Sequence, residues 1–272
     1  MTAVDTGLPS VWRVGVSRGG VELRQFFRER DAVVFTFSFP ALMLLLLGTI
    51  FDHANPQGIT GSQLFAASMV AAGIASTTFV NVGIGIAMDR DDGTLKRLRG
   101  MPVPAFSYFL GKVVLVAVAT VAEVALLLGI GVLLFDLPLP ATPGRWWTFS
   151  WVALLGLVAC TLLGIAVSSL PRSGRSASAV IMLPFIALQF ISGVLFDPIS
   201  QLPSSLVRIA SVFPLKWMAQ GFRSVFLPDS IAYREVAGAW EHGRIALVLG
   251  AWCVGGLVLC LTTFRWQSRR DR

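Results

Sequence analysis

Long apolar stretches alternate with short polar segments along the whole chain. Each stretch holds 19 to 25 residues, and they cover 32–51, 64–88, 113–135, 146–170, 178–196 and 245–264. The hydrocarbon core of a bilayer takes about 20 apolar residues per helix, so each stretch predicts one membrane-spanning helix. The expected fold is all-α: a polytopic membrane protein with a six-helix transmembrane domain over 32–264.

Two segments outside these stretches are also expected to be helical. In residues 1–31, Leu23, Phe26 and Phe27 share one helical face among five arginines, which predicts an amphipathic helix in the cytoplasmic interface. The segment 197–244 is too charged to span and too apolar for a solvated loop. It predicts short re-entrant or outer helices before the last span, with breaks at Gly193, Pro198, Pro203 and Pro214.

Composition excludes several classes of protein. The chain is 55% hydrophobic and 14% charged, with a mean hydropathy of +0.73, whereas a soluble domain carries nearer a quarter charged residues. The net charge of +7 does not indicate a nucleic-acid partner, because the charges flank the apolar stretches and form no basic face. The three cysteines lie inside predicted helices without the spacing of a metal or disulfide site.

The basic residues predict the orientation. With six spans, one side of the membrane receives 5 Arg and Lys in 1–31, 5 in 89–112, 2 in 171–177 and 4 in the tail 265–272. The other side receives 6. Basic residues concentrate on the cytoplasmic side of membrane proteins, so both termini are expected in the cytoplasm.

Two polar residues inside the spans are candidates for an intramembrane site. Glu123 is the one charged side chain well inside a predicted span, and it can serve as a substrate contact, a proton carrier or a structural hydrogen-bonding group. Asn81 belongs to a small and polar stripe, Gly73, Thr77, Asn81 and Gly85, which favours close packing between helices over a substrate contact.

The loop between the second and third stretches is the most informative segment. It reads DRDDGTLKRLRGMPVPAFSYFLGK from Asp89 to Lys112. Acids precede a Gly-Thr and bases follow, which suits the dipole of a short helix. Leu95 and Leu98 make a small apolar edge, and Pro102 and Pro104 end the helix. The segment 89–100 is therefore expected to be a short, charged helix under the membrane, although a solvated loop fits the spacing equally well.

In combination these features resemble the membrane-spanning subunit of ABC-2 type transporters, the permeases of bacterial drug, lipid and polysaccharide exporters. The resemblance covers nearly the whole chain and rests on the N-terminal helix, the six spans, the 89–112 loop and the late segment. Residues of the loop and the late segment match the family pattern: Asp89, Gly93, Thr94, Leu95, Leu98, Pro102, Gly111, Lys112, Gly193, Pro198, Pro203, Pro214 and Arg223. Asp89, Asp91 and Met101 stand where the family often has Glu, Glu and Thr.

The resemblance implies that transport across the membrane and ATP hydrolysis are carried out by different chains. It assigns the 89–100 helix as a coupling helix that docks on a cytoplasmic ATPase, with contributing residues Asp89, Asp92, Gly93, Thr94, Leu95, Leu98 and Arg99. Gly193, Pro198 and Pro214 fall in its outer gate. The resemblance also implies a bacterial plasma membrane, two ATPase subunits and a second permease, identical or related. No P-loop occurs in the sequence, so ATP and Mg²⁺ are expected on the partner and no cofactor on this chain.

The expected function is export of a hydrophobic or amphipathic substrate, a drug or a lipid. Three alternatives stay open at this point: a permease for a lipid-linked glycan, a membrane enzyme acting on lipids, and an uncoupled secondary transporter. An enzyme requires clustered acid, base or metal-binding groups, and the two histidines, His53 and His242, are far apart in sequence. A secondary transporter favours inverted repeats and several intramembrane charges.

Overall fold

The computed structural model describes residues 11–53, 58–100 and 105–264, and its regular elements in these ranges are helices. α1 (Val11–Arg28) leads into α2 (Arg30–Ile50). The second pass is one rod made of α3 (Gly61–Ala75), the π-helix η1 (Ser76–Val80) and α4 (Asn81–Asp91). The short α5 (Thr94–Arg99) follows, and then α6 (Ala105–Phe135), α7 (Pro143–Val167) and α8 (Gly174–Ile191).

The last part of the chain is divided into short helices before a final long one. These are the 3₁₀ turn η2 (Ile199–Gln201), α9 (Ser204–Val212), α10 (Pro214–Phe226), the 3₁₀ turn η3 (Asp229–Arg234) and α11 (His242–Thr263). Gly193 takes a left-handed φ of +72° in the turn after α8, Pro198 precedes η2, and Pro214 is the first residue of α10. Pro203 precedes α9, so all four breaks predicted from the sequence lie at element boundaries.

Five helices in the described ranges are long and apolar enough to cross a membrane: the α3–α4 rod, α6, α7, α8 and α11. The first predicted span differs. Its helix α2 begins with Arg30 and Asp31, and its apolar part, Thr36–Ile50, is shorter than the other five. The third predicted span begins at 113, whereas α6 begins at Ala105. The first turns of α6 pack against α1 and, through Tyr108, against α4 and α5. The predicted tail 265–272 lies outside the described residues.

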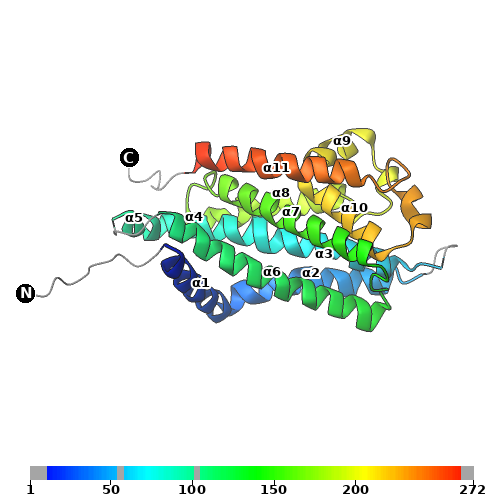
Figure 1. Ribbon diagram of the computed structural model, residues 1–272, viewed down its shortest axis with the longest axis horizontal. Coiled ribbons are helices and arrows are strands. Elements are labelled where there is room, and N and C mark those ends of the chain that lie inside the picture. Colours follow the sequence, from blue (N-terminus) through cyan, green and yellow to red (C-terminus); the bar gives the residue numbers. More distant parts are fainter. Residues whose placement is uncertain (1–10, 54–57, 101–104, 265–272) are drawn as a thin grey trace, which may run out of the picture.

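The long helices run back and forth along one elongated bundle (Figure 1). We call its two ends the α5 end and the α10 end. The α5 end holds α5, the turn between α7 and α8 and the last residues of α11, whereas α9, α10 and η3 gather at the α10 end (Figure 1). The α3–α4 rod, α6, α7 and α11 run from one end toward the other, whereas α2 begins partway along the bundle, where α1 ends (Figure 1).

α3 lies at the centre of the bundle and contacts α2, α6, α7 and α10. Its residues from Met69 to Ile74 are 0–1% exposed. Small side chains in this rod let neighbouring backbones approach closely. A Cβ added to Gly164 of α7 would lie 2.7 Å from the carbonyl oxygen of Phe79, so α7 packs directly on the backbone of the π-helix.

α1 packs along the outer part of α6. Two glycines of α1 form the contact: a Cβ on Gly15 would lie 2.4 Å from Leu110 Cδ2, and one on Gly19 would lie 2.6 Å from Val114 Cβ. The predicted amphipathic helix is present from Val11, and residues 1–10 lie outside the described ranges. Its exposed apolar side chains include Trp12, Val16, Val21 and Phe27.

Candidate functional site

α5 forms a short, capped helix at its end of the bundle (Figure 1). α4 ends at Asp91, Asp92 is its C-cap, and Gly93 takes a left-handed φ of +74°, a conformation that glycine adopts without strain. The helix then runs only from Thr94 to Arg99 and ends at Gly100. The predicted 89–100 helix is therefore too long, because Asp89 belongs to the last turn of α4. Pro102 and Pro104 lie outside the described residues.

Leu95 faces inward. It is 0% exposed and packs in a cluster with Val82, Ile86, Tyr108 and Ile165, which come from α4, α6 and α7. Leu98 is half-buried against the same cluster. The apolar edge predicted from Leu95 and Leu98 thus faces the bundle, and Leu95 anchors α5 to it.

The opposite side of α5 is polar. Lys96 and Arg97 are exposed, as are Asp91 and Asp92 at the preceding junction. An Arg97 nitrogen donates to the carbonyl oxygen of Asp92 at 3.3 Å, which supports the turn at Gly93. The side chain of Arg99 lies outside the described set. The surface that α5 offers to another molecule is therefore charged rather than apolar.

Asp89 joins an ion cluster among α1, α4 and α6. The ammonium of Lys112 lies 2.9 Å from Asp89 Oδ2 and donates a 2.7 Å hydrogen bond to Glu22 Oε2. Tyr108 donates to Asp89 Oδ2 at 2.8 Å, and an Arg18 nitrogen donates to Glu22 Oε1 at 3.1 Å. Lys112, Glu22 and Tyr108 are 6%, 7% and 2% exposed, so the charges compensate one another away from solvent.

Two further contacts fasten the end of α4 to the turn between α7 and α8. Arg90, itself buried, donates to the carbonyl oxygen of Ser168. The carboxylate of Asp91 accepts a 2.9 Å hydrogen bond from the backbone N–H of Gly174, the first residue of α8. Residues 89, 90 and 91 thus hold three separate parts of the bundle, directly before α5.

The polar stripe of the second pass meets partners inside the chain. Thr36 of α2 donates to Asn81 Oδ1 at 3.1 Å, and Thr120 of α6 contacts Thr77 at 3.4 Å. A Cβ on Gly73 would lie 2.9 Å from Glu123 Cγ, so this glycine makes the room that Glu123 occupies. The packing role that the sequence favours for the stripe agrees with these contacts.

Glu123 is 0% exposed, and neither of its carboxylate oxygens has a hydrogen-bond partner within the described part of the chain. It lies on α6 beside the middle of the α3–α4 rod, where the π-helix widens the backbone. Glu123 lies against Gly73 of this rod, and Asn81, eight residues further along the rod, faces the pocket that α6 also lines.

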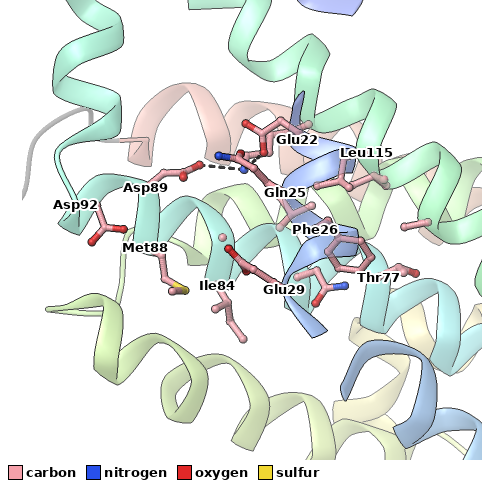
Figure 2. A pocket seen from close by; sticks show the side chains of 16 residues that line it. Glu22, Gln25, Phe26, Glu29, Thr77, Ile84, Met88, Asp89, Asp92 and Leu115 are labelled. Carbon is pink, nitrogen blue, oxygen red and sulfur yellow. Dashed lines mark hydrogen bonds and ion pairs between the residues drawn. The ribbon is translucent and has the colours of Figure 1, made fainter. Parts of the chain in front are cut away.

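A pocket of ≈200 Å³ lies between α1, α4 and α6 near the α5 end. Figure 2 shows it from close by, with Asp92 toward one end of the row of lining side chains and Thr77 toward the other. The dashed lines there mark the contacts of the ion cluster, which forms one part of the wall. Asp89, Asn81 and Asp92 are thus placed around one cavity.

At the α10 end, Arg223 holds the predicted outer segment together. It is 2% exposed, donates to Ser68 Oγ at 2.9 Å and to the Gly193 carbonyl oxygen at 2.7 Å, and pairs with Glu235 at 2.6 Å. These contacts join α10, α3, the turn after α8 and the residue after η3. Gly193 therefore belongs to this cluster, whereas Pro198 and Pro214 shape the neighbouring backbone.

Sequence reasoning missed the ion cluster as a unit. From the sequence, Lys112 contributes only to the count of basic residues and to the family pattern, and Glu22 and Tyr108 have no predicted role. The sequence signal for such a cluster is a lysine one or two turns inside an apolar helix, because a buried ammonium group requires a partner of opposite charge. In the described ranges no three His, Cys, Asp or Glu side chains gather in a way that could hold a metal ion.

The comparisons with known proteins agree on one family. A profile of the family described as ABC-2 type transporter matches residues 20–227. Among curated proteins, the chain is 22% identical over 163 residues to the "Probable multidrug ABC transporter permease YbhR" of Escherichia coli K12, and equally to its counterpart in Escherichia coli O157:H7. The alignment covers 60% of this chain and 43% of YbhR, so the chain spans less than half the length of these relatives.

Proposed function

Because the chain belongs to the ABC-2 type transporter family over residues 20–227, we propose that it is the membrane-spanning subunit of an ATP-driven exporter. Residues 32–264 form its transmembrane domain in the bacterial plasma membrane. The complete transporter contains two copies of a separate ATPase, which bind ATP and Mg²⁺, and a second permease, identical or related. The substrate is a hydrophobic or amphipathic drug or lipid, which the transporter takes from the cytoplasm or the inner leaflet.

The observation that carries this proposal is how α5 packs against the bundle. Leu95 is buried in the bundle while Lys96 and Arg97 are exposed, so α5 is fixed on one side and open on the other. The excess of basic residues at the α5 end supports a cytoplasmic location for this end. A partner ATPase therefore docks on the charged face of α5, not on an apolar edge.

The contacts around α5 support a mechanical role. A push on this helix reaches α4 through Gly93 and the buried Leu95, and α1 and α6 through Asp89 and Lys112. Rigid, packed helices switch between discrete arrangements, so a small displacement biases the bundle between inward-open and outward-open states. The Arg223 cluster around Gly193 closes the outer gate, and the short helices near Pro198 and Pro214 dip into the outer leaflet.

The test uses charge reversal on the open side of α5. Lys96→Glu combined with Arg97→Glu changes exposed side chains, and Arg172→Glu reverses an exposed charge in the turn between α7 and α8 as a matched control. The permease is purified together with its ATPase partner. The double variant is expected to lose ATPase binding and ATP-dependent transport while the control keeps both. If the double variant binds and transports like the unmodified protein, α5 is not the coupling helix.

A further inference from the structure

α1 meets the bundle through one face and exposes the opposite one. Gly15 and Gly19 pack on α6, and Glu22, on the same side of the helix, pairs with Lys112. On the outer face lies an apolar stripe of three side chains that are 50–66% exposed, Trp12, Val16 and Phe27. Their spacings of four and eleven residues are close to one and three helical turns, so the three side chains lie in one row.

A basic stripe runs along α1 beside the apolar one. Arg13, Arg24 and Arg28 are exposed and repeat at spacings of eleven and four residues, which also places them in one row. Arg24 and Arg28 form no ion pair within the described part of the chain. Glu22 is the single acidic residue in the sequence of α1, and it points toward α6. The outer face of α1 is therefore positively charged and complementary to an anionic partner.

The neighbours of α1 place it at the level of the membrane surface. Figure 1 shows α1 on the outside of the bundle, directly before α2. The glycines of α1 contact Leu110 and Val114, on either side of the position at which the long apolar stretch of α6 begins. At its other end, α2 begins two residues after α1, and the apolar part of α2 begins six residues later, at Thr36.

The second of these distances can be compared with the thickness of the lipid headgroup layer. Six helical residues rise by about 9 Å. The headgroup layer on each side of the hydrocarbon core is roughly 5–8 Å thick. Both ends of α1 therefore lie close to this layer, in which aromatic side chains reach toward the acyl chains and arginines reach toward the phosphates.

We propose that the outer face of α1 is a docking surface for anionic phospholipids, with lipid phosphates on the basic stripe and acyl chains against the apolar stripe. A guanidinium group binds a phosphate through two parallel hydrogen bonds, and each arginine close to an anionic surface strengthens binding about fivefold. A zwitterionic lipid offers less, because its own ammonium group opposes the arginines. Lipid then holds α1 from one side while α6 and the ion pair of Glu22 hold it from the other.

The experiment identifies the molecules that contact the outer face by photo-crosslinking. Gly20 lies four residues from both Val16 and Arg24, between the two stripes, and nothing lies within 4 Å of a Cβ added there. Gly20→p-benzoylphenylalanine therefore places the probe without displacing a neighbour. The full chain is reconstituted in nanodiscs of phosphatidylglycerol and phosphatidylcholine in equal amounts, illuminated, and analysed for lipid adducts by mass spectrometry. Ser17→p-benzoylphenylalanine, at another exposed position, repeats the measurement.

Phosphatidylglycerol adducts are expected to exceed phosphatidylcholine adducts about fivefold or more at both probe positions. Arg24→Gln combined with Arg28→Gln is expected to reduce this preference to less than twofold. Arg172→Gln combined with Arg175→Gln is the matched control, because these exposed arginines lie between α7 and α8 and at the start of α8, and it is expected to keep the preference. A probe at Leu133, which is 81% exposed in the last turns of α6, is expected to form lipid adducts without preference.

Three results would overturn the proposal: adducts with a second copy of the chain or another protein instead of lipid, equal adducts with the two lipids, or a preference that persists without Arg24 and Arg28. The inference goes beyond the proposed function, because lipid docking on α1 requires neither the ATPase nor ATP. Its failure would leave ATPase docking on α5 unaffected, and a permease that binds no ATPase would still show the lipid preference.

Discussion

Glu22 and Lys112, ninety residues apart in the chain, form a 2.7 Å ion pair between Oε2 and Nζ with both side chains almost completely buried. Lys112 also contacts Asp89, so one ammonium group joins α1 to α4 through α6. The pair explains why α1 lies against the bundle at a fixed place. Through the same contacts, a displacement of α4 is transmitted directly to α1.

Lys112→Met is expected to destabilise the protein by about 3–5 kcal/mol, because it removes the ammonium group that pairs with both the buried Glu22 and the half-buried Asp89. The triple variant Lys112→Met, Glu22→Gln, Asp89→Asn is expected to recover most of this loss. Thermal unfolding in detergent measures both. A triple variant as unstable as the single one would mean that the packing of Lys112, not its charge, matters.

Leu95→Ala is expected to cost about 2–5 kcal/mol, since it opens a cavity in the cluster that holds α5. Leu98→Ala is the comparison at the half-buried position of the same helix and is expected to cost less. Melting temperatures of the two variants, measured side by side, test the order. If Leu98→Ala is the more harmful, α5 is rotated relative to the arrangement described above.

Gly19→Ala is expected to destabilise the contact of α1 with α6 by about 1–3 kcal/mol, because the new Cβ would lie 2.6 Å from Val114 Cβ. Gly20→Ala is the matched control: nothing lies within 4 Å of its added Cβ. Helix propensity predicts that this control is neutral or stabilises by up to about 1 kcal/mol. Equal melting temperatures for the two variants would show that α1 does not pack on α6 through Gly19.

Single cysteines are expected to react from opposite sides of the membrane. In a background without Cys160, Cys253 and Cys260, Ala141→Cys lies exposed in the loop between α6 and α7, and Arg172→Cys lies exposed at the α5 end. A membrane-impermeant maleimide applied to intact cells is expected to label position 141 and to label position 172 only after permeabilisation. The reverse pattern would place α5 outside the cell.

The sequence predicted the elements better than the contacts. Five of the apolar stretches fall on helices that are long and apolar enough to cross a membrane, because hydropathy is a local property of the chain. The largest error concerned the start of α6, where Ala105 replaces the expected 113, since apolarity along the chain does not show that these turns pack on α1. The predicted helix 89–100 includes α5 but is too long. The sequence groups Asp89 with the acidic residues before Gly93, whereas in the structure Asp89 belongs to α4 and contacts Tyr108 and Lys112.

The sequence by itself determined that this is a multi-pass helical membrane protein, where its chain turns, and on which end its basic residues gather. Only the tertiary structure decided that Leu95 faces the bundle, that Lys112 lies between Glu22 and Asp89, and that Glu123 lies against Gly73. The physical reason is that helix formation and membrane insertion depend on residues close together in the chain. The rotation of one helix against another depends instead on how their side chains fit across distances of up to ninety residues.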